Sequence, residues 1–165
     1  MHKWLALSAS IVVLDQATKL IVTQYLSLHK AVAVTPYFNL VLAHNPGAAF
    51  SFLSSASGWQ RWLFIAIAVL ASVWILFLLR RYERLRLFSA ALSLVLAGAV
   101  GNLIDRLWVG AVIDFLDFHA FGYHWPAFNV ADTAITCGAL LLIWDALRPH
   151  KTRTLEPQIN ADERR

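Results

Sequence analysis

The chain has 165 residues, of which 59% are hydrophobic and 15% are charged, and its mean hydropathy is +0.58. A soluble domain averages about 45–50% apolar and about 25% charged residues, so this composition excludes an ordinary soluble protein. The net charge of +4 is, by itself, compatible with a nucleic-acid partner. However, the basic residues gather in short segments between apolar runs, which is typical of membrane topology signals and excludes a phosphate-binding face. The single cysteine, Cys137, leaves no internal disulfide and no paired-cysteine metal or redox motif. We therefore predict an integral membrane protein without a nucleic-acid partner.

Four apolar segments have the length of a membrane-spanning helix. They cover residues 4–26, 62–79, 87–106 and 127–147. Because a helix rises about 1.5 Å per residue, about 20 apolar residues cross the hydrocarbon core of a bilayer. A cleaved signal peptide is the alternative for the first segment, since Lys3 precedes it and small residues follow at 6–10. The apolar run continues through Ile11–Leu14, however, which favours a spanning helix.

The spans belong to one membrane domain, residues 1–150, with outer loops at 27–60 and 107–126 and a charged, disordered tail at 151–165. In the first loop, Ala31–Ala43 is rich in Val, Leu and aromatic residues, and we interpret it as extended strand closed by a turn at His44–Gly47. The second loop contains His119 and His124, which we interpret as isolated loop residues. The sequence thus predicts an all-α membrane fold, a four-helix bundle, with extended segments outside it.

The basic residues also predict how the bundle is oriented. Four spans place both termini on one side, and four arginines lie within residues 80–86, between the second and third spans. More basic residues follow Leu147, whereas the other two loops are poor in them. The positive-inside rule therefore places both termini in the cytoplasm and the 27–60 and 107–126 loops on the outer face.

Two carboxylates stand out at the outer end of the predicted bundle. Asp114 lies in the second outer loop and Asp132 at the start of the fourth span, so a short link brings both to the outer leaflet. Acids at membrane depth mark a functional site or pair with another group. Two carboxylates in a poorly hydrated site share one proton and offer water a general acid and a general base together. The alternative, which spacing leaves open, is that each Asp caps a helix or meets Arg106.

The other polar residues of the spans fit structural roles at least as well as chemistry. Asp15 and Lys19 lie four residues apart on one helix face, so we expect them to neutralise each other. Asp105 is adjacent to Arg106, which suggests a structural ion pair or an interface anchor. The spacing leaves open whether the side-chain amides satisfy backbone groups or hold a substrate. These amides belong to Asn45, Asn102 and Asn129.

Competing chemistries have weaker support. A Ser–Lys peptidase needs its lysine at the site, but Lys19 already has Asp15 in reach. Cys137 has no base beside it, and the six histidines form no HExxH motif, so we expect neither a metal nor a cofactor. Two functions from other classes remain: a small proton-coupled transporter or channel subunit, with Asp15, Asp105 and Asp132 as a relay, and a non-enzymatic assembly factor. A relay requires acids spread through the membrane depth, whereas most of these cluster at one end.

Five motifs give the chain a specific resemblance when taken together in their order and spacing. They are residues 15–19 (DQATK), 45–51 (NPGAAFS), 101–106 (GNLIDR), 112–115 (VIDF) and 128–132 (FNVAD). Over residues 4–148 the chain resembles bacterial lipoprotein signal peptidase, the signal peptidase II family.

The resemblance implies an aspartyl endopeptidase of the bacterial inner membrane that cuts signal peptides from prolipoproteins, before a diacylglyceryl-modified cysteine. It implies an extracytoplasmic β-sheet cradle near residues 31–52, an active site at the outer leaflet, and membrane lipid and lipidated prolipoproteins as partners. We expect the protein to act as a monomer. Asp114 and Asp132 match the family's catalytic pair. The positions that match its substrate-holding polar residues are Asn45, Asn102, Arg106 and Asn129. Three further positions match family residues that support stability and local structure: Asp15, Lys19 and Asp105.

Overall fold

The structure, a computed structural model, describes residues 1–28, 30–47 and 58–148. The predicted tail at 151–165 and the end of the 45–51 motif lie outside these residues. Within them, four helices are long and apolar enough to cross a membrane: α1 (His2–Tyr25), α2 (Trp59–Arg81), α3 (Arg86–Trp108) and α4 (Val130–Leu147). An antiparallel sheet contains β1 (Val32–Thr35), β2 (Phe38–Asn45), β3 (Val112–Ala120) and β4 (Tyr123–His124), in that order.

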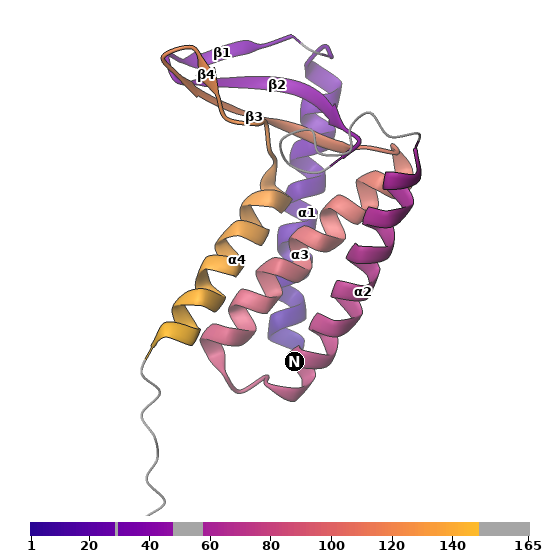
Figure 1. The fold of residues 1–165 in the computed structure, drawn as a ribbon, viewed down its shortest axis with the longest axis vertical. Coiled ribbons are helices and arrows are strands. Elements are labelled where there is room, and N and C mark those ends of the chain that lie inside the picture. The colour runs from indigo at the N-terminus through magenta and orange to yellow at the C-terminus, as the bar shows by residue number, and fades with distance from the viewer. Residues whose placement is uncertain (29, 48–57, 149–165) are drawn as a thin grey trace, which may run out of the picture.

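Helix α3 lies at the centre of the bundle and packs against α1, α2 and α4 (Figure 1). Two glycines allow α3 and α4 to approach closely. A side chain at Gly98 would collide with the backbone of Ala131, and one at Gly138 would lie 2.7 Å from the Ala91 carbonyl oxygen. In lipid, the hydrophobic effect does not drive helices together, because the surrounding acyl chains are as apolar as the side chains. Small residues at the interface let the helices approach closely and gain packing contacts instead.

An apolar cluster fills the bundle near the end that holds the N-terminus. Its buried members are Trp4, Ile75, Leu79, Leu92 and Leu96. The outward faces of the helices are also apolar and exposed, as at Leu20 on α1 and Leu70 on α2. Large exposed apolar faces are costly in water but suit contact with lipid chains. The helices thus have the surface expected of a membrane bundle.

The sheet lies across the opposite end of the bundle from the N-terminus and the α2–α3 connection (Figure 1). It extends beyond the helices on the side of α4, and β3 connects it directly to the end of α3. A second apolar cluster, containing Val22, Leu42, Ile113 and Phe115, joins α1 to β2 and β3. The sheet is therefore fixed to the bundle by packing as well as by the chain.

The structure differs in detail from three predicted segments. The extended segment at 31–43 is interrupted at Pro36, where the chain turns between two strands, and the predicted turn at His44–Gly47 begins later because His44 and Asn45 still belong to β2. The 107–126 loop contains β3 and β4, which pair with β2 and with each other. Helix α4 begins at Val130 instead of 127, since Phe128 forms a bridge to Leu116 of β3.

Candidate active site

The first residues of α4 form both a helix cap and one wall of a pocket. Asn129 is the N-cap: its Oδ1 accepts a hydrogen bond from the backbone N–H of Asp132 at 2.8 Å. Asp132 Oδ2 accepts one in return from the Asn129 N–H at 3.2 Å. This reciprocal capping box satisfies two N–H groups that the helix itself leaves unpaired. It fixes the Asp132 carboxylate at the end of the bundle that meets the sheet.

Asp114 reaches the same pocket from β3. The antiparallel pairing places Asp114 opposite Ala43 of β2, next to a register shift between Leu40 and Ala43. Asp114 and Asp132 both line a pocket of about 960 Å³, together with Asn45. Sequence reasoning expected the two acids to meet at one end of the bundle, and the structure brings them to one pocket.

Three buried or half-buried amides hold the two carboxylates. Asn129 Nδ2 donates to Asp114 Oδ1 at 2.7 Å, and Asn45 Nδ2 donates to Asp114 Oδ2 at 3.1 Å. Asn102 Nδ2 donates to Asp132 Oδ1 at 2.8 Å. Asn129 Nδ2 also lies 3.2 Å from Asn102 Oδ1, so the amides connect the two acids in one network. In this structure, the amides of Asn45, Asn102 and Asn129 hydrogen-bond to the two acids and so fix their positions.

The environment of Asp114 favours its protonated form. Burial raises the pKa of Asp114 to about 7, and the nearby charge of Asp132 acts in the same direction. Hydrogen bonds from Asn45 and Asn129 oppose this rise without cancelling it. Near neutral pH, Asp114 therefore exchanges its proton readily beside a second carboxylate. The pair can hold a general acid and a general base at once.

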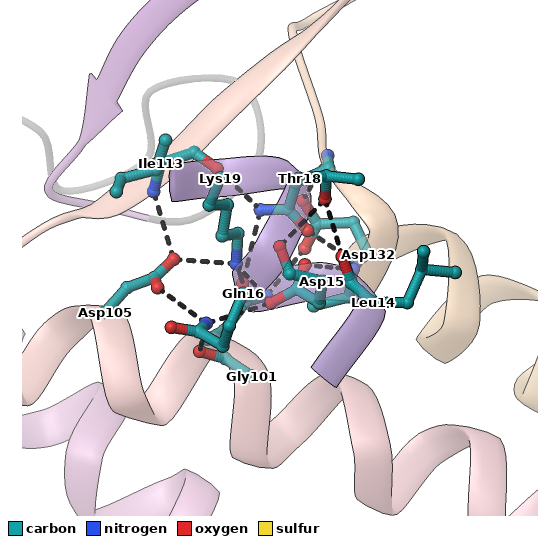
Figure 2. Close-up of polar contacts among 12 residues, drawn as sticks. Leu14, Asp15, Gln16, Thr18, Lys19, Gly101, Asp105, Ile113 and Asp132 are labelled. Carbon is teal, nitrogen blue, oxygen red and sulfur yellow. Dashed lines mark hydrogen bonds and ion pairs between the residues drawn. The ribbon is translucent and has the colours of Figure 1, made fainter. Parts of the chain in front are cut away.

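A second buried network lies behind the site, between α1 and α3 (Figure 2). Lys19 Nζ lies 2.8 Å from Asp15 Oδ2 and 2.7 Å from Asp105 Oδ2, and all three side chains are about 2% exposed or less. The predicted contact between Asp15 and Lys19 is confirmed. The predicted pair of Asp105 and Arg106 was wrong, because adjacent residues on a helix point in different directions. Asp105 instead turns inward to Lys19.

This lysine network connects to the site at three points. Lys19 Nζ donates to Asn102 Oδ1 at 3.2 Å, which leaves the Asn102 amide nitrogen to face Asp132. Asp15 Oδ1 accepts from the backbone N–H of Ala131 at 2.9 Å, and Asp105 Oδ2 accepts from that of Ile113 at 3.2 Å. The network therefore fixes both chain segments that contain the pocket acids.

Arg106 lies beside these residues and does not appear among those that line the pocket. Its Nη2 donates to the Gly47 carbonyl at 3.3 Å, and its guanidinium lies over the Phe64 ring, 4.9 Å from the centroid. Arg61 Nε donates to the Arg106 carbonyl at 2.8 Å, which caps the end of α3. Arg106 Nε is buried and has no hydrogen-bond partner among the described residues.

The sequence analysis missed a polar pair that also lines the pocket. Asp117 and His124 line it, and His124 Nδ1 lies 2.8 Å from Asp117 Oδ1. His119 and His124 are not isolated loop residues, since they lie on β3 and β4 with ring centroids 4.8 Å apart. The available signal was Asp117 itself, a second acid in an otherwise apolar stretch that follows Asp114 by three residues.

The described residues contain no group of three or more His, Cys, Asp or Glu side chains placed to hold a metal ion. What this part of the chain offers for hydrolysis is a pair of carboxylates, with surrounding amides and a guanidinium. Such a pair can activate water without a covalent intermediate.

Comparison with known proteins identifies the family. A family model described as signal peptidase (SPase) II matches residues 7–148. A lipoprotein signal peptidase of Paraburkholderia phymatum is 52% identical over 145 residues, which are 88% of this chain and 87% of the relative. One from Burkholderia mallei is 54% identical with the same coverage.

Solved structures agree with these relatives. A bacterial membrane enzyme solved by the in meso method at 2.3 Å superposes with a TM-score of 0.80 at 31% identity, covering 89% of this chain and 88% of the other. A second, at 1.9 Å, gives 0.79 at 30% identity, covering 91% and 96%. Because these matches are to a peptidase family, they do not support the transporter and assembly-factor alternatives. The chain belongs to the signal peptidase II family of lipoprotein signal peptidases and is an aspartic-type protease.

Proposed function

We propose that this protease cuts the signal peptide from diacylglyceryl-modified prolipoproteins, immediately before the lipidated cysteine, with Asp114 and Asp132 as its catalytic residues. The observation that carries the proposal is the shared pocket, in which two carboxylates lie on one amide network and the pKa of Asp114 is raised to about 7. The names of the relatives support the substrate class.

The mechanism uses the single proton that the two acids share. A water between them loses a proton to the ionised carboxylate while its oxygen attacks the scissile carbonyl carbon. The protonated carboxyl donates its proton to the carbonyl oxygen, giving a neutral tetrahedral intermediate. When this collapses, the C–N bond breaks and the amide nitrogen receives a proton from the protonated carboxyl. The ionised carboxylate takes a proton from one hydroxyl of the intermediate, so that a carboxylic acid and an amine leave and the pair again holds one proton. The two acids titrate as a coupled pair, so either can begin as the acid.

The surrounding residues hold the pair and the substrate. Asn45, Asn102 and Asn129 orient the carboxylates through the hydrogen bonds described above. Arg106 remains cationic although it is partly shielded from water, and we assign it a supporting role beside the site, because its unpaired Nε is buried and Arg106 does not line the pocket. Asp15, Lys19 and Asp105 stabilise the bundle behind the site.

The membrane placement follows the charge distribution. The sheet, whose strands contribute residues to the pocket, lies at the opposite end of the bundle from the N-terminus and from the α2–α3 connection (Figure 1). That connection and its borders contain the arginines at 80–86. The positive-inside rule then favours cytoplasmic termini and an outer-leaflet site in the bacterial inner membrane. There a monomer, with lipid around its apolar faces, would meet lipidated precursors directly, with the sheet as an extracytoplasmic cradle.

Purified enzyme incubated with matched precursors tests the substrate assignment. We expect cleavage of a precursor whose cysteine carries diacylglyceryl, with mass spectrometry showing the lipidated cysteine as the new N-terminus. The same precursor without lipid should remain uncut. Equal cleavage of both precursors, or cleavage at another bond, would contradict the proposal.

The raised pKa of Asp114 predicts a pH profile. Below about pH 7 the pair keeps its shared proton, and above it the proton is lost, so kcat/KM should fall as pH rises through neutrality. At acidic pH the partner carboxylate also becomes protonated, and the general base is lost. The pH dependence of kcat/KM, which reports the free enzyme, measures this directly. A rate that stays level well above neutral pH would show that no shared proton is required.

A further inference from the structure

Asn39, Asp117 and His124 form a hydrogen-bonded chain across the sheet. The proposed mechanism does not use these three side chains. Asn39 Nδ2 on β2 donates to Asp117 Oδ2 on β3 at 2.8 Å. Asp117 in turn contacts His124 Nδ1 on β4, at 2.8 Å from Oδ1 and 3.1 Å from Oδ2. Asn39 and Asp117 are buried, whereas the His124 side chain is 55% exposed. The buried members therefore hold an imidazole that remains accessible.

The carboxylate determines which ring nitrogen faces a ligand. Burial acts to raise the pKa of Asp117, but hydrogen bonds from His124 and Asn39 outweigh it and leave the pKa lowered, so Asp117 is an anion at neutral pH. An anion accepts hydrogen bonds only, so the proton of a neutral ring lies on Nδ1. Nε2 is then a hydrogen-bond acceptor.

His124 lies in the same pocket as the proposed catalytic acids, so its ring can contact a substrate bound there. Asp117 and His124 line the same pocket as Asp114 and Asp132. An extended polypeptide that occupies the pocket leaves backbone N–H groups in need of acceptors. The ester groups of a diacylglyceryl chain have no N–H or O–H group, so they cannot donate a hydrogen bond to Nε2, whereas a peptide backbone can.

We propose that His124 is a substrate-binding residue whose Nε2 accepts a backbone N–H of the precursor beside the cleaved bond. Asp117 is the positioning residue that fixes the tautomer and plane of the ring. The inference rests on the proposed cleavage site at Asp114 and Asp132, and it adds a peptide subsite on the sheet side of the same pocket.

The first experiment separates binding from chemistry. With a lipidated precursor peptide, we expect His124→Ala to raise KM by about fivefold to tenfold with kcat little changed, the scale of one lost hydrogen bond. His124→Gln, whose side-chain oxygen can replace Nε2, should recover most of the binding. The matched control is Tyr123→Ala, the neighbouring β4 residue, which is 83% exposed and should keep the KM of the wild type.

Asp117→Asn tests the positioning role while the imidazole is retained. The new amide can donate to Nδ1, which moves the ring proton to Nε2 and converts the acceptor into a donor. A donor repels a substrate N–H, so KM should rise as in His124→Ala. A wild-type KM in Asp117→Asn would overturn the role of the carboxylate.

The second experiment identifies the partner atom in the wild-type enzyme. Lipidated precursors are made with one amide N–H near the cleaved bond replaced by an ester oxygen, one position at a time. One of them should bind more weakly to the wild type, and His124→Ala should then cause no further loss. An undiminished His124→Ala effect with every ester precursor, or an unchanged KM throughout, would overturn the inference. Failure of the proposed function would appear separately, as normal kcat in variants of Asp114 or Asp132.

Discussion

Asp114→Asn and Asp132→Asn should each reduce kcat by about 100- to 10,000-fold, the usual contribution of a positioned general acid or base. An amide has the size of a carboxylic acid but cannot take a proton from water or return one to the leaving nitrogen. The new amide oxygen can still accept one of the two hydrogen bonds that each carboxylate received, while its NH2 group faces the second donor. Both variants should therefore insert and accumulate, with only a modest loss of stability. Turnover of the lipidated precursor by purified protein measures the effect.

The matched control for this pair is Asp145→Asn. Asp145 also lies on α4, but near the opposite end of the helix from the pocket and outside its wall. Its replacement should leave kcat unchanged. Near-normal turnover in either pocket variant would contradict the assignment of Asp114 and Asp132, and the family's chemistry would then have to lie on other residues.

Lys19→Met should destabilise the fold by about 3–5 kcal/mol, the scale for removing one partner of a buried ion pair. Lys19 is the cation between Asp15 and Asp105, and without it two buried carboxylates face each other without compensation. Unfolding in detergent, followed by circular dichroism, measures the loss. Lys3→Met, at an exposed position on the same helix, is the control.

A triple variant separates charge from packing in this prediction. Replacing both acids by asparagine in the Lys19→Met background removes the uncompensated charges and should recover part of the stability. Because Lys19 also orients Asn102, the recovered protein should still cleave more slowly than the wild type. A Lys19→Met protein as stable as the wild type would show that the network contributes little to folding.

Much of the site could be predicted from the sequence because lipid restricts where polar residues occur. A carboxylate such as Asp132 is costly at membrane depth, so it marks a functional site or a residue that pairs with another group. The pairing of Asp15 with Lys19 was equally accessible, since helix geometry places residues four apart on one face. These predictions depend on local spacing and on the chemistry of a single segment.

The features that sequence reasoning missed depend on pairing between distant segments. The start of α4 is set by Phe128, whose backbone bonds to Leu116 of β3 instead of beginning the helix. The partner of Asp105 comes from α1, far away in the sequence, and adjacency to Arg106 gave the wrong pair. His124 appeared isolated because Asp117 reaches it only when β3 and β4 pair. Spacing along the chain contains no information on such contacts.

The glycine contacts between α3 and α4 have a consequence for how a precursor arrives. Gly98 and Gly138 bring the two backbones so close that no side chain fits between them, and a polypeptide cannot thread that seam. The pocket is bordered instead by the exposed Cys137 on the outward side of α4. A precursor anchored by its acyl chains would therefore arrive by lateral diffusion within the bilayer, and its rate of capture would depend on its two-dimensional density and not on its bulk concentration.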